Sequence, residues 1–196
     1  LEEGFPMEDL RLVVAAMAAA AAEAGVPVVT GDTKVVDRGK GDGIYVNTSG
    51  IGRVRDGIRV APDRAKPGDV ILVSGPVGDH GIAVMAARNG LELSTELVSD
   101  SACVLPLVRA LLDAVPSTRT LRDPTRGGLA TALCEIAASA AVGLRIDEGA
   151  VPVRREVRAA CELLGFDPLY VACEGRFLAI VPPTEWETAL SAIQAL

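Results

Sequence analysis

The sequence predicts a globular α/β or α+β fold. Strand-like apolar runs such as "VILVSG" (70–75) alternate with helical patterns along the chain, which is typical of that class. The 196 residues are 49% hydrophobic and 23% charged, a composition of folded rather than disordered chains. The stretch "DGIRVAPDRAKPGD" (56–69) is rich in Pro, Gly and charge. We therefore expect two domains, residues 1–61 and residues 62–196.

The first third of the chain predicts one helix and two strands. Residues 7–24 have a helical apolar pattern, and Gly25 with Pro27 is a typical helix stop. The run "VPVV" (26–29) predicts a short buried strand, and "GIYVNTSGIGRV" (43–54) predicts a second strand. Between them lies the polar, glycine-rich loop "VTGDTKVVDRGKGDG" (29–43).

The remainder predicts strands alternating with helices. A strand at 70–75 leads through a tight loop into the helix "IAVMAARNG", which ends at Gly90, and residues 104–114 form another helix. The segment "TRTLRDPT" leads through "RGG" into the helix "LATALCEIAASAAVG" (129–143). We then expect a strand "LRIDE" (144–148), a helix at 154–165, a strand pair or one bent strand at 169–181, and a closing helix at 184–196.

Charge and cysteine usage exclude some classes of protein. The net charge of −7 argues against broad nucleic-acid binding, which needs a basic face. The apolar run "VVAAMAAAAAEAG" is too short to span a bilayer, so we expect a soluble, cytoplasmic protein without a membrane partner. The four cysteines form no CxxC pair, which does not favour a zinc site. Cys134 and Cys161 lie in apolar helical patterns and are predicted to be core residues.

Three loops share one design, with glycines and an Asp before a helix or strand. They are "TGDTK" (30–34), "GPVGDHG" (75–81) and "RDPTRGG" (122–128). Glycine lets backbone N–H groups approach an anion, and a helix N-terminus adds a favourable dipole. Asp is a hard ligand for Mg²⁺, and Lys and Arg neutralise phosphate. Any one of these loops is also compatible with an ordinary turn; the three together indicate a phosphate and metal site.

Each side chain in these loops has a structural alternative. Asp32 could cap a turn or bind a metal, and Lys34 could be a solvated surface charge or contact phosphate. His80, the only histidine, could be structural or catalytic at its predicted helix start. Arg126 precedes a predicted helix N-terminus, where the dipole disfavours a cation, so its position favours an anion site.

One further carboxylate lies in an apolar segment. Glu174 falls in "YVACEGRF", next to Gly175. A half-buried carboxylate there could be a general base. Alternatively, Glu174 could form an ion pair with Arg176 and have no further role.

Four strings resemble one family over nearly the whole chain. "VVTGDTKVVDRGKGDGIYVNTSGIG", "VSGPVGDHGIAVM", "LRDPTRGGLATALCEIA" and "DPLYVACEGRFLAIV" resemble the hydrogenase maturation factor HypE. That family belongs to the superfamily of aminoimidazole ribonucleotide synthetase, selenophosphate synthetase and thiamine-monophosphate kinase. The resemblance implies a ferredoxin-like ATP-binding N-terminal domain, followed by a C-terminal mixed-sheet domain with helices packed on one face.

The resemblance also implies a reaction and partners. The family converts the thiocarboxamide of its own C-terminal cysteine into a thiocyanate with ATP and Mg²⁺. The resulting cyanide becomes a ligand of the iron in [NiFe] hydrogenase. HypF is the implied carbamoyltransferase, the HypC–HypD complex the implied acceptor, and a homodimer the implied state. Because the family's first strands and its terminal cysteine have no counterpart here, we expect a fragment that is inactive alone.

Individual roles are carried over at the matching motif positions. Asp32 corresponds to a metal-binding Asp, and Lys34 and Glu174 to residues that help to deprotonate the thiocarboxamide nitrogen. His80 is a further catalytic candidate. The remaining matching positions are candidates for ATP binding: Gly31, Thr33, Asp79, Gly81, Asp123, Thr125, Arg126, Gly127 and Gly128. Two alternatives stay open, namely a thiamine-monophosphate kinase-like enzyme and a non-catalytic scaffolding domain.

Overall fold

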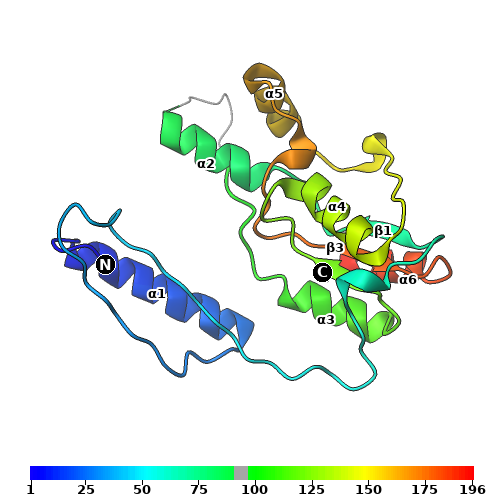
Figure 1. The fold of residues 1–196 in the computed structure, drawn as a ribbon, viewed down its shortest axis with the longest axis horizontal. Coiled ribbons are helices and arrows are strands. Elements are labelled where there is room, and N and C mark those ends of the chain that lie inside the picture. Colours follow the sequence, from blue (N-terminus) through cyan, green and yellow to red (C-terminus); the bar gives the residue numbers. More distant parts are fainter. Residues whose placement is uncertain (91–96) are drawn as a thin grey trace. The chain divides into compact units, whose positions relative to one another are not determined.

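The chain forms two compact units, residues 1–54 and residues 55–196. The computed structural model describes residues 1–90 and 97–196 (Figure 1). Contacts within the chain define these units, and such a division does not test where one domain ends and the next begins. The domain boundary expected between residues 61 and 62 therefore stays a prediction.

The first unit contains one long helix, α1 (Met7–Ala24). Pro6 precedes it in an extended conformation, and Glu8 and Asp9 lie in its first turn, where carboxylates complement the helix dipole. Gly25 ends the helix with φ 63°, and its N–H donates to the carbonyl of Ala22. The helix predicted over residues 7–24 is confirmed.

The two strands predicted in this unit are wrong. Residues 26–29 and 43–54 contain no strand, and the side chains of Val28 and Val29 are 68% and 85% exposed. In the described part of the unit, the one β-bridge joins Glu2 and Val36. A β pattern in sequence forms a strand only when a partner supplies the ladder hydrogen bonds, and these segments have none in the unit.

Glu2 organises the polar loop that follows. Its carboxylate accepts the backbone N–H groups of Gly39 and Gly43, and its own N–H donates to the carbonyl of Gly43 at 2.8 Å. The hydrogen bond from Gly39, together with that from Gly43, lowers the pKa of Glu2. One carboxylate therefore closes the glycine-rich turn at residues 37–43.

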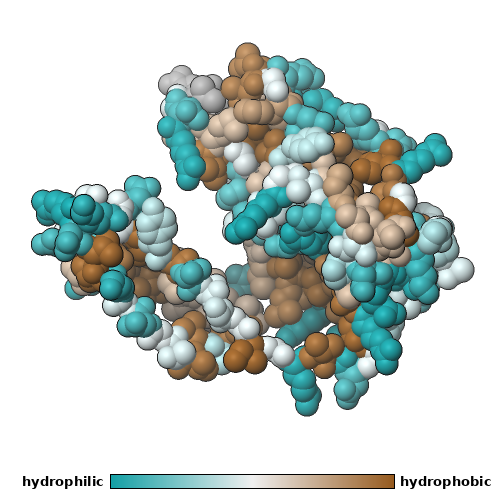
Figure 2. Space-filling model, viewed as in Figure 1, coloured by the Kyte–Doolittle hydropathy of each residue, from teal (hydrophilic) through white to brown (hydrophobic). Residues whose placement is uncertain are grey.

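The first unit exposes its apolar side chains. None of its residues is buried, and the exposed side chains include Leu12, Val14, Tyr45, Ile51 and Val54. Figure 2 shows apolar side chains at the surface of α1. The packing that the sequence suggests for this unit is therefore not made within the unit itself.

The second unit is built on a three-stranded antiparallel sheet of order β1-β3-β2. The strands are β1 (Val70–Val73), β2 (Thr120–Arg122) and β3 (Leu178–Val181). The strand at 70–75 is confirmed, and the predicted segment 169–181 is a strand only from Leu178 onward. The strand predicted at 144–148 is wrong, and β2 was not predicted. The fold class of mixed helices and strands is confirmed, although every described strand pair is antiparallel.

Helices cover both faces of this sheet, whereas one helical face was expected. Leu178 and Ile180 of β3 pack with α4 (Gly128–Ala140). Ala179 and Val181 face the other way and pack with α3 (Leu105–Ala114) and α6 (Trp186–Gln194). The four-residue strand is wholly apolar and wholly buried, because successive side chains of a strand point to opposite faces.

The remaining helices pack beside the sheet. Helices α2 (Asp79–Asn89) and α5 (Arg155–Leu164) lie side by side (Figure 1) and bury Ile82, Val157 and Cys161. Three short 3-10 helices complete the unit: η1 (Pro62–Arg64), η2 (Glu148–Ala150) and η3 (Pro168–Tyr170). The predicted helices of this unit are confirmed.

The two cysteines predicted to be core residues differ in burial. Cys161 is buried as predicted, but Cys134 is exposed, because it lies on α4 beside, not within, the row formed by Leu133 and Ile136. Within residues 1–90 and 97–196, no helix is both long enough and apolar enough to cross a membrane.

Candidate functional site

The loop before α2 is tied down by buried groups. Gly78 precedes the helix, and Asp79, 2% exposed, begins it. The Asp79 carboxylate meets Nε of Arg154 at 2.9 Å. The Gly81 N–H donates to the carbonyl of Ala172 at 3.1 Å. Asp79 therefore joins α2 to the residue that precedes α5, and its predicted role in ATP binding stays a prediction.

Asp79 carries an electrostatic cost. Burial raises the pKa of its carboxyl, the Arg154 guanidinium opposes that rise, and the nearby Asp100 adds to it. Its Oδ1 has no hydrogen-bond partner among residues 1–90 and 97–196. An ionised carboxylate in this position depends on Arg154, since burying an unpaired charge is costly.

The loop before α4 places two glycines in the left-handed region. Gly127 has φ 65° and Gly128 has φ 63°. A Cβ on Gly128 would lie 2.5 Å from the carbonyl oxygen of Leu169, so only glycine fits there. The backbone thus brings the N-terminus of α4 against the segment that leads to Glu174.

The polar side chains of this loop stay at its surface. Asp123 pairs with Arg122 at 2.5 Å, and the Thr125 hydroxyl donates to Asp123 at 3.4 Å. Arg126 is exposed and forms no ion pair within the described part of the chain. An exposed cation beside a helix N-terminus can hold an anion such as phosphate.

The segment 169–175 lies between these two loops. The Cys173 N–H donates to the carbonyl of Pro124 at 3.1 Å, and the Cys173 sulfur accepts the N–H of Gly78 at 3.2 Å. Burial raises the pKa of Cys173 to about 11, which favours the protonated thiol, and the two hydrogen bonds make Cys173 a structural link. The structure therefore brings together the loops at 75–81 and 122–128 and the segment that carries Glu174.

Glu174 is an exposed carboxylate on a constrained backbone. Its N–H donates to Oδ1 of Asp100 at 2.9 Å. A Cβ on the next residue, Gly175, would lie only 1.7 Å from the carbonyl oxygen of Asp100, so the two backbones touch. The Glu174 Oε1 lies 3.9 Å from Nε2 of His80. The imidazole is therefore the nearest titratable side chain described beside this carboxylate, at a distance longer than a direct hydrogen bond.

The alternative pairing of Glu174 with Arg176 is wrong. Nε of Arg176 donates to the carbonyl of Pro76 at 3.2 Å, and its Nη1 donates to the carbonyl of Gly175 at 3.0 Å. The guanidinium therefore binds backbone oxygens of the surrounding loops. The carboxylate of Glu174 is left facing His80 and solvent, as a proton acceptor requires.

The "TGDTK" loop lies in the first unit and is exposed throughout. Gly31, Asp32, Thr33 and Lys34 are all exposed, and Asp32 accepts only the N–H of the next residue, at 2.8 Å, among the described contacts. Mg²⁺ is commonly held through one or two carboxylates together with nucleotide phosphates, so Asp32 fits as one such ligand. The described residues contain no cluster of three metal-binding side chains.

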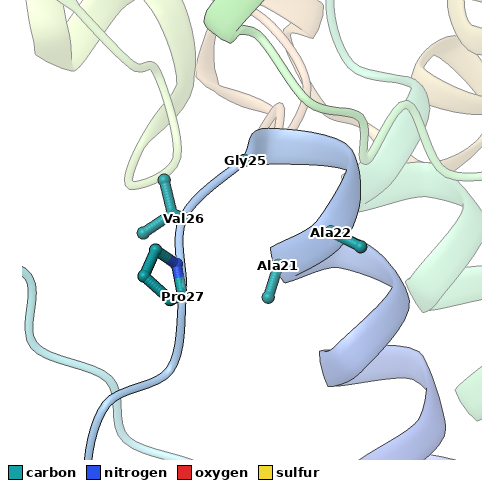
Figure 3. Close-up of a pocket in the computed structure, with 5 residues that line it drawn as sticks. All are labelled: Ala21, Ala22, Gly25, Val26 and Pro27. Carbon is teal, nitrogen blue, oxygen red and sulfur yellow. The ribbon is translucent and has the colours of Figure 1, made fainter.

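A shallow hollow lies at the end of α1, apart from these residues. It is lined by Ala21, Ala22, Gly25, Val26 and Pro27 (Figure 3) and has a volume of about 310 Å³. Its lining offers no titratable side chain. None of the predicted site residues contributes to it.

Sequence reasoning missed Ser99, Asp100 and Arg154. Asp100 is 7% exposed and contacts Glu174 across 74 positions of sequence. The string "VSDSA" around it has only the polar, small residues of an ordinary turn. Arg154 is one of several arginines near α5, and no local signal distinguishes it.

Family models match both units. The AIR synthase related protein C-terminal domain matches residues 66–196, and the N-terminal domain of the same family matches residues 1–54. The chain belongs to the AIR synthase related protein family. In this family context, the loops at 75–81 and 122–128 and the Glu174 segment fall in the C-terminal domain, whereas Asp32 and Lys34 fall in the N-terminal one.

Individual relatives confirm the resemblance to HypE. A carbamoyl dehydratase HypE from Azotobacter vinelandii is 55% identical over 195 residues, which cover 100% of this chain and 57% of that protein. A crystal structure of a HypE–HypF complex matches with a TM-score of 0.98 and 46% identity, over 100% of this chain and 64% of that one. The chain thus spans little more than half the length of the curated relatives it matches.

A further solved HypE structure contains ATP. A hydrogenase maturation protein HypE in complex with ATP matches with a TM-score of 0.89 and 45% identity, over 99% of this chain and 58% of that one. ATP binding is therefore a property of a protein that shares this fold and nearly half of these residues.

Proposed function

We propose that this chain is the part of an ATP-dependent carbamoyl dehydratase that carries the proton-accepting carboxylate, and that the enzyme acts in [NiFe]-hydrogenase maturation. The observation that carries the proposal is Glu174. Its carboxylate is exposed, yet its backbone is fixed by the Asp100 carboxylate, and its Oε1 faces His80 at 3.9 Å. Similarity to carbamoyl dehydratases HypE supports the same reaction.

The proposed chemistry requires a base. ATP phosphorylates the amide oxygen of a cysteine thiocarboxamide, and one N–H proton leaves as the imidate forms. Breaking the C–O bond then expels phosphate while the second N–H proton leaves, which forms the C≡N bond of a thiocyanate. The sum converts thiocarboxamide and ATP into thiocyanate, ADP and phosphate. A positioned carboxylate speeds such proton removal by roughly 10²- to 10⁴-fold.

The remaining residues have roles around that step. Arg126 and the backbone N–H groups of Gly127 and Gly128 hold negative charge as phosphate departs. Asp32 is one ligand of Mg²⁺, which neutralises nucleotide phosphate charge. Gly31, Thr33, Asp123 and Thr125 complete the nucleotide-binding loops of the proposal, on the ground of their motif positions alone.

Lys34 and Glu174 form the pair expected to act together. A lysine beside the carboxylate favours its ionised form and helps to neutralise phosphate. Lys34 belongs to the first unit and Glu174 to the second, so their meeting in one cleft stays a prediction. Lys34→Met in a chain extended to the length of the HypE relatives should slow thiocyanate formation, and an unchanged rate would remove Lys34 from the mechanism.

Partners follow from the same proposal. HypF delivers the carbamoyl group, and a crystal structure of a HypE–HypF complex supports that assignment. The HypC–HypD complex receives the cyanide. A homodimer forms through the first unit, whose apolar side chains are exposed. Cytoplasmic localisation is proposed with these partners.

Glu174→Gln in the extended chain tests the proposal. The variant keeps the shape of the side chain but removes the base, so we expect carbamoylation of the cysteine to persist and thiocyanate formation to slow by roughly 10²-fold or more. Mass spectrometry follows the loss of water from the adduct. Glu162→Gln, on the exposed side of α5, is the matched control and should react at the wild-type rate.

The result separates the competing functions. Thiocyanate formation at the wild-type rate in Glu174→Gln would mean that another group takes the proton. A thiamine-monophosphate kinase-like enzyme has no comparable support, since the high-identity matches described above are to carbamoyl dehydratases. If the chain is instead a scaffolding domain, the cysteine adduct should lose no water, even in the wild-type extended chain with HypF, carbamoyl phosphate and ATP.

A further inference from the structure

Three segments that are far apart in sequence meet at the imidazole of His80. The ring belongs to the first turn of α2. Its Nδ1 lies 2.8 Å from Oγ of Ser99, and its Nε2 lies 3.9 Å from Oε1 of Glu174. The imidazole therefore lies between a hydroxyl and a carboxylate, with one ring nitrogen toward each.

The tautomer of the His80 ring depends on which way the hydroxyl proton of Ser99 points. Oγ of Ser99 accepts the backbone N–H of Ser101 at 3.1 Å, which occupies one lone pair. One lone pair and the single hydroxyl proton remain, and Nδ1 of His80, 2.8 Å away, is the other partner of Oγ among the described contacts. A hydroxyl that donates to Nδ1 leaves the proton of the neutral ring on Nε2, which is the nitrogen that faces Glu174.

We propose that Ser99 is a positioning residue for Glu174. Its hydroxyl donates to Nδ1 of His80, fixes the Nε2–H tautomer, and directs that N–H toward the Glu174 carboxylate. Because Nε2 then has no free lone pair, His80 orients the carboxylate and does not relay its proton. Glu174 returns the proton to solvent, to which over a third of its side chain is exposed. The inference rests on the proposed role of Glu174 as base.

The neighbouring residue supports the same assignment. Asp100 holds the backbone N–H of Glu174 at 2.9 Å, while Ser99 holds the imidazole that faces its side chain. Two consecutive residues thus restrain both ends of the same glutamate. The backbone contact between Asp100 and Gly175 fixes the two segments relative to each other. A displacement of one segment would therefore displace the other.

Nitrogen NMR of the imidazole tests the inference without any enzymatic assay. His80 is the sole histidine of the 196-residue sequence, so ¹⁵N-histidine labelling of this chain gives signals that need no assignment. We expect the neutral ring to be protonated at Nε2, with Nδ1 shifted as a hydrogen-bond acceptor. Ser99→Ala should move the Nδ1 signal toward that of a solvated imidazole, and Ser99→Thr should restore it.

The same NMR spectrum provides a control variant and two results that would contradict the inference. Ser101→Ala removes only a hydroxyl that is exposed, because Ser101 contributes its backbone N–H, and should leave the spectrum unchanged. A wild-type ring protonated at Nδ1 would overturn the inference, and so would a Ser99→Ala spectrum identical to the wild-type one.

The rate of thiocyanate formation tests whether the tautomer of His80 matters for the proposed reaction. In the chain extended to the length of the HypE relatives, Ser99→Ala should slow thiocyanate formation by about tenfold without changing the affinity for ATP, and Ser99→Thr should recover most of the rate. An unaltered rate in Ser99→Ala, where Glu174→Gln is slow, would refute the positioning role alone. An unaltered rate in Glu174→Gln would refute the proposed function, while the NMR result still decides the hydrogen bond.

Discussion

Oδ1 of Asp100 accepts the backbone N–H of Glu174 at 2.9 Å, and it lies 3.4 Å from the N–H of Gly175. The acceptor is buried and is supplied from a segment 74 positions away. The backbone position of the candidate base is thus set by a side chain that itself takes no part in the proposed chemistry.

Asp100→Ala should destabilise the second unit. It leaves the buried N–H of Gly175 and the partly buried N–H of Glu174 without an acceptor, which costs about 1–3 kcal/mol in the free energy of unfolding. Asp100→Asn keeps the Oδ1 acceptor and should lose less. Urea denaturation gives the free energies, and the amide chemical shift of Glu174 reports the hydrogen bond. Equal destabilisation by both variants would show that the charge, and not the acceptor, matters.

Gly175→Ala should disturb the same contact more severely. The new Cβ would lie 1.7 Å from the Asp100 carbonyl oxygen and 2.7 Å from the Ala102 nitrogen, and neither backbone atom can rotate away. We expect a loss of about 1–3 kcal/mol or more in the free energy of unfolding.

Gly143→Ala is the matched control for that substitution. Nothing lies within 4 Å of its added Cβ, so it should be neutral or stabilise by roughly 0.4–1 kcal/mol. Equal stability of the two alanine variants in urea denaturation would contradict the close approach of the two backbones.

Arg154→Ala should destabilise the protein in a pH-dependent way. The Asp79 carboxylate would be buried without its cation, at a cost of about 1–3 kcal/mol at neutral pH. Burial raises the pKa of Asp79 above its ordinary value of 3.8. The stability linked to its protonated form is therefore fully present below pH 3.8 and lost as pH rises through the folded-state pKa.

The destabilisation by Arg154→Ala, measured against wild type, should thus shrink from pH 7 toward pH 4. Urea denaturation at the two pH values measures it. Arg155→Ala removes the neighbouring exposed arginine and should show little loss at either pH. A loss in Arg154→Ala that is the same at both pH values would exclude Asp79 as the titrating partner.

Thiol reactivity should sort the four cysteines. Burial raises the pKa of Cys173 to about 11 and also raises that of Cys161, so both remain protonated at pH 8, and the thiolate is the reactive form. Cys134 is exposed and Cys103 half-buried. A disulfide reagent should label Cys134 first, and Cys134→Ser should remove that phase. Rapid labelling of Cys173 in the folded protein would contradict its burial.

Helices could be predicted from the sequence because their signals are local. Gly25, Gly90 and Gly165 end α1, α2 and α5 in the left-handed conformation, and each follows directly after its apolar periodic run. Strands could not be predicted equally well, since 26–29 and 144–148 have strand-like composition but no partner in their units. β2 (Thr120–Arg122) has little strand-like pattern and is a strand because it pairs with β3.

The candidate site likewise has features that could be predicted from the sequence and features that could not. The loops at 75–81 and 122–128 could be predicted because glycines and polar residues before a helix have a local meaning. The contacts of Glu174 with His80 and Asp100 span 94 and 74 positions, and no periodicity or motif encodes them. The alternative pairing of Glu174 with Arg176 was suggested by their proximity in sequence, whereas the Arg176 guanidinium donates to the backbone carbonyls of Pro76 and Gly175.

The central strand β3 follows the Glu174 segment closely in sequence and should open slowly. β3 begins at Leu178, pairs on both edges and is buried on both faces, so its amide hydrogens should exchange with deuterium only on global unfolding of the unit. Glu174 precedes that strand by four residues, with its N–H already held by a buried acceptor. The carboxylate thus combines the solvent contact of a surface side chain with a backbone anchored next to the slowest-opening part of the unit.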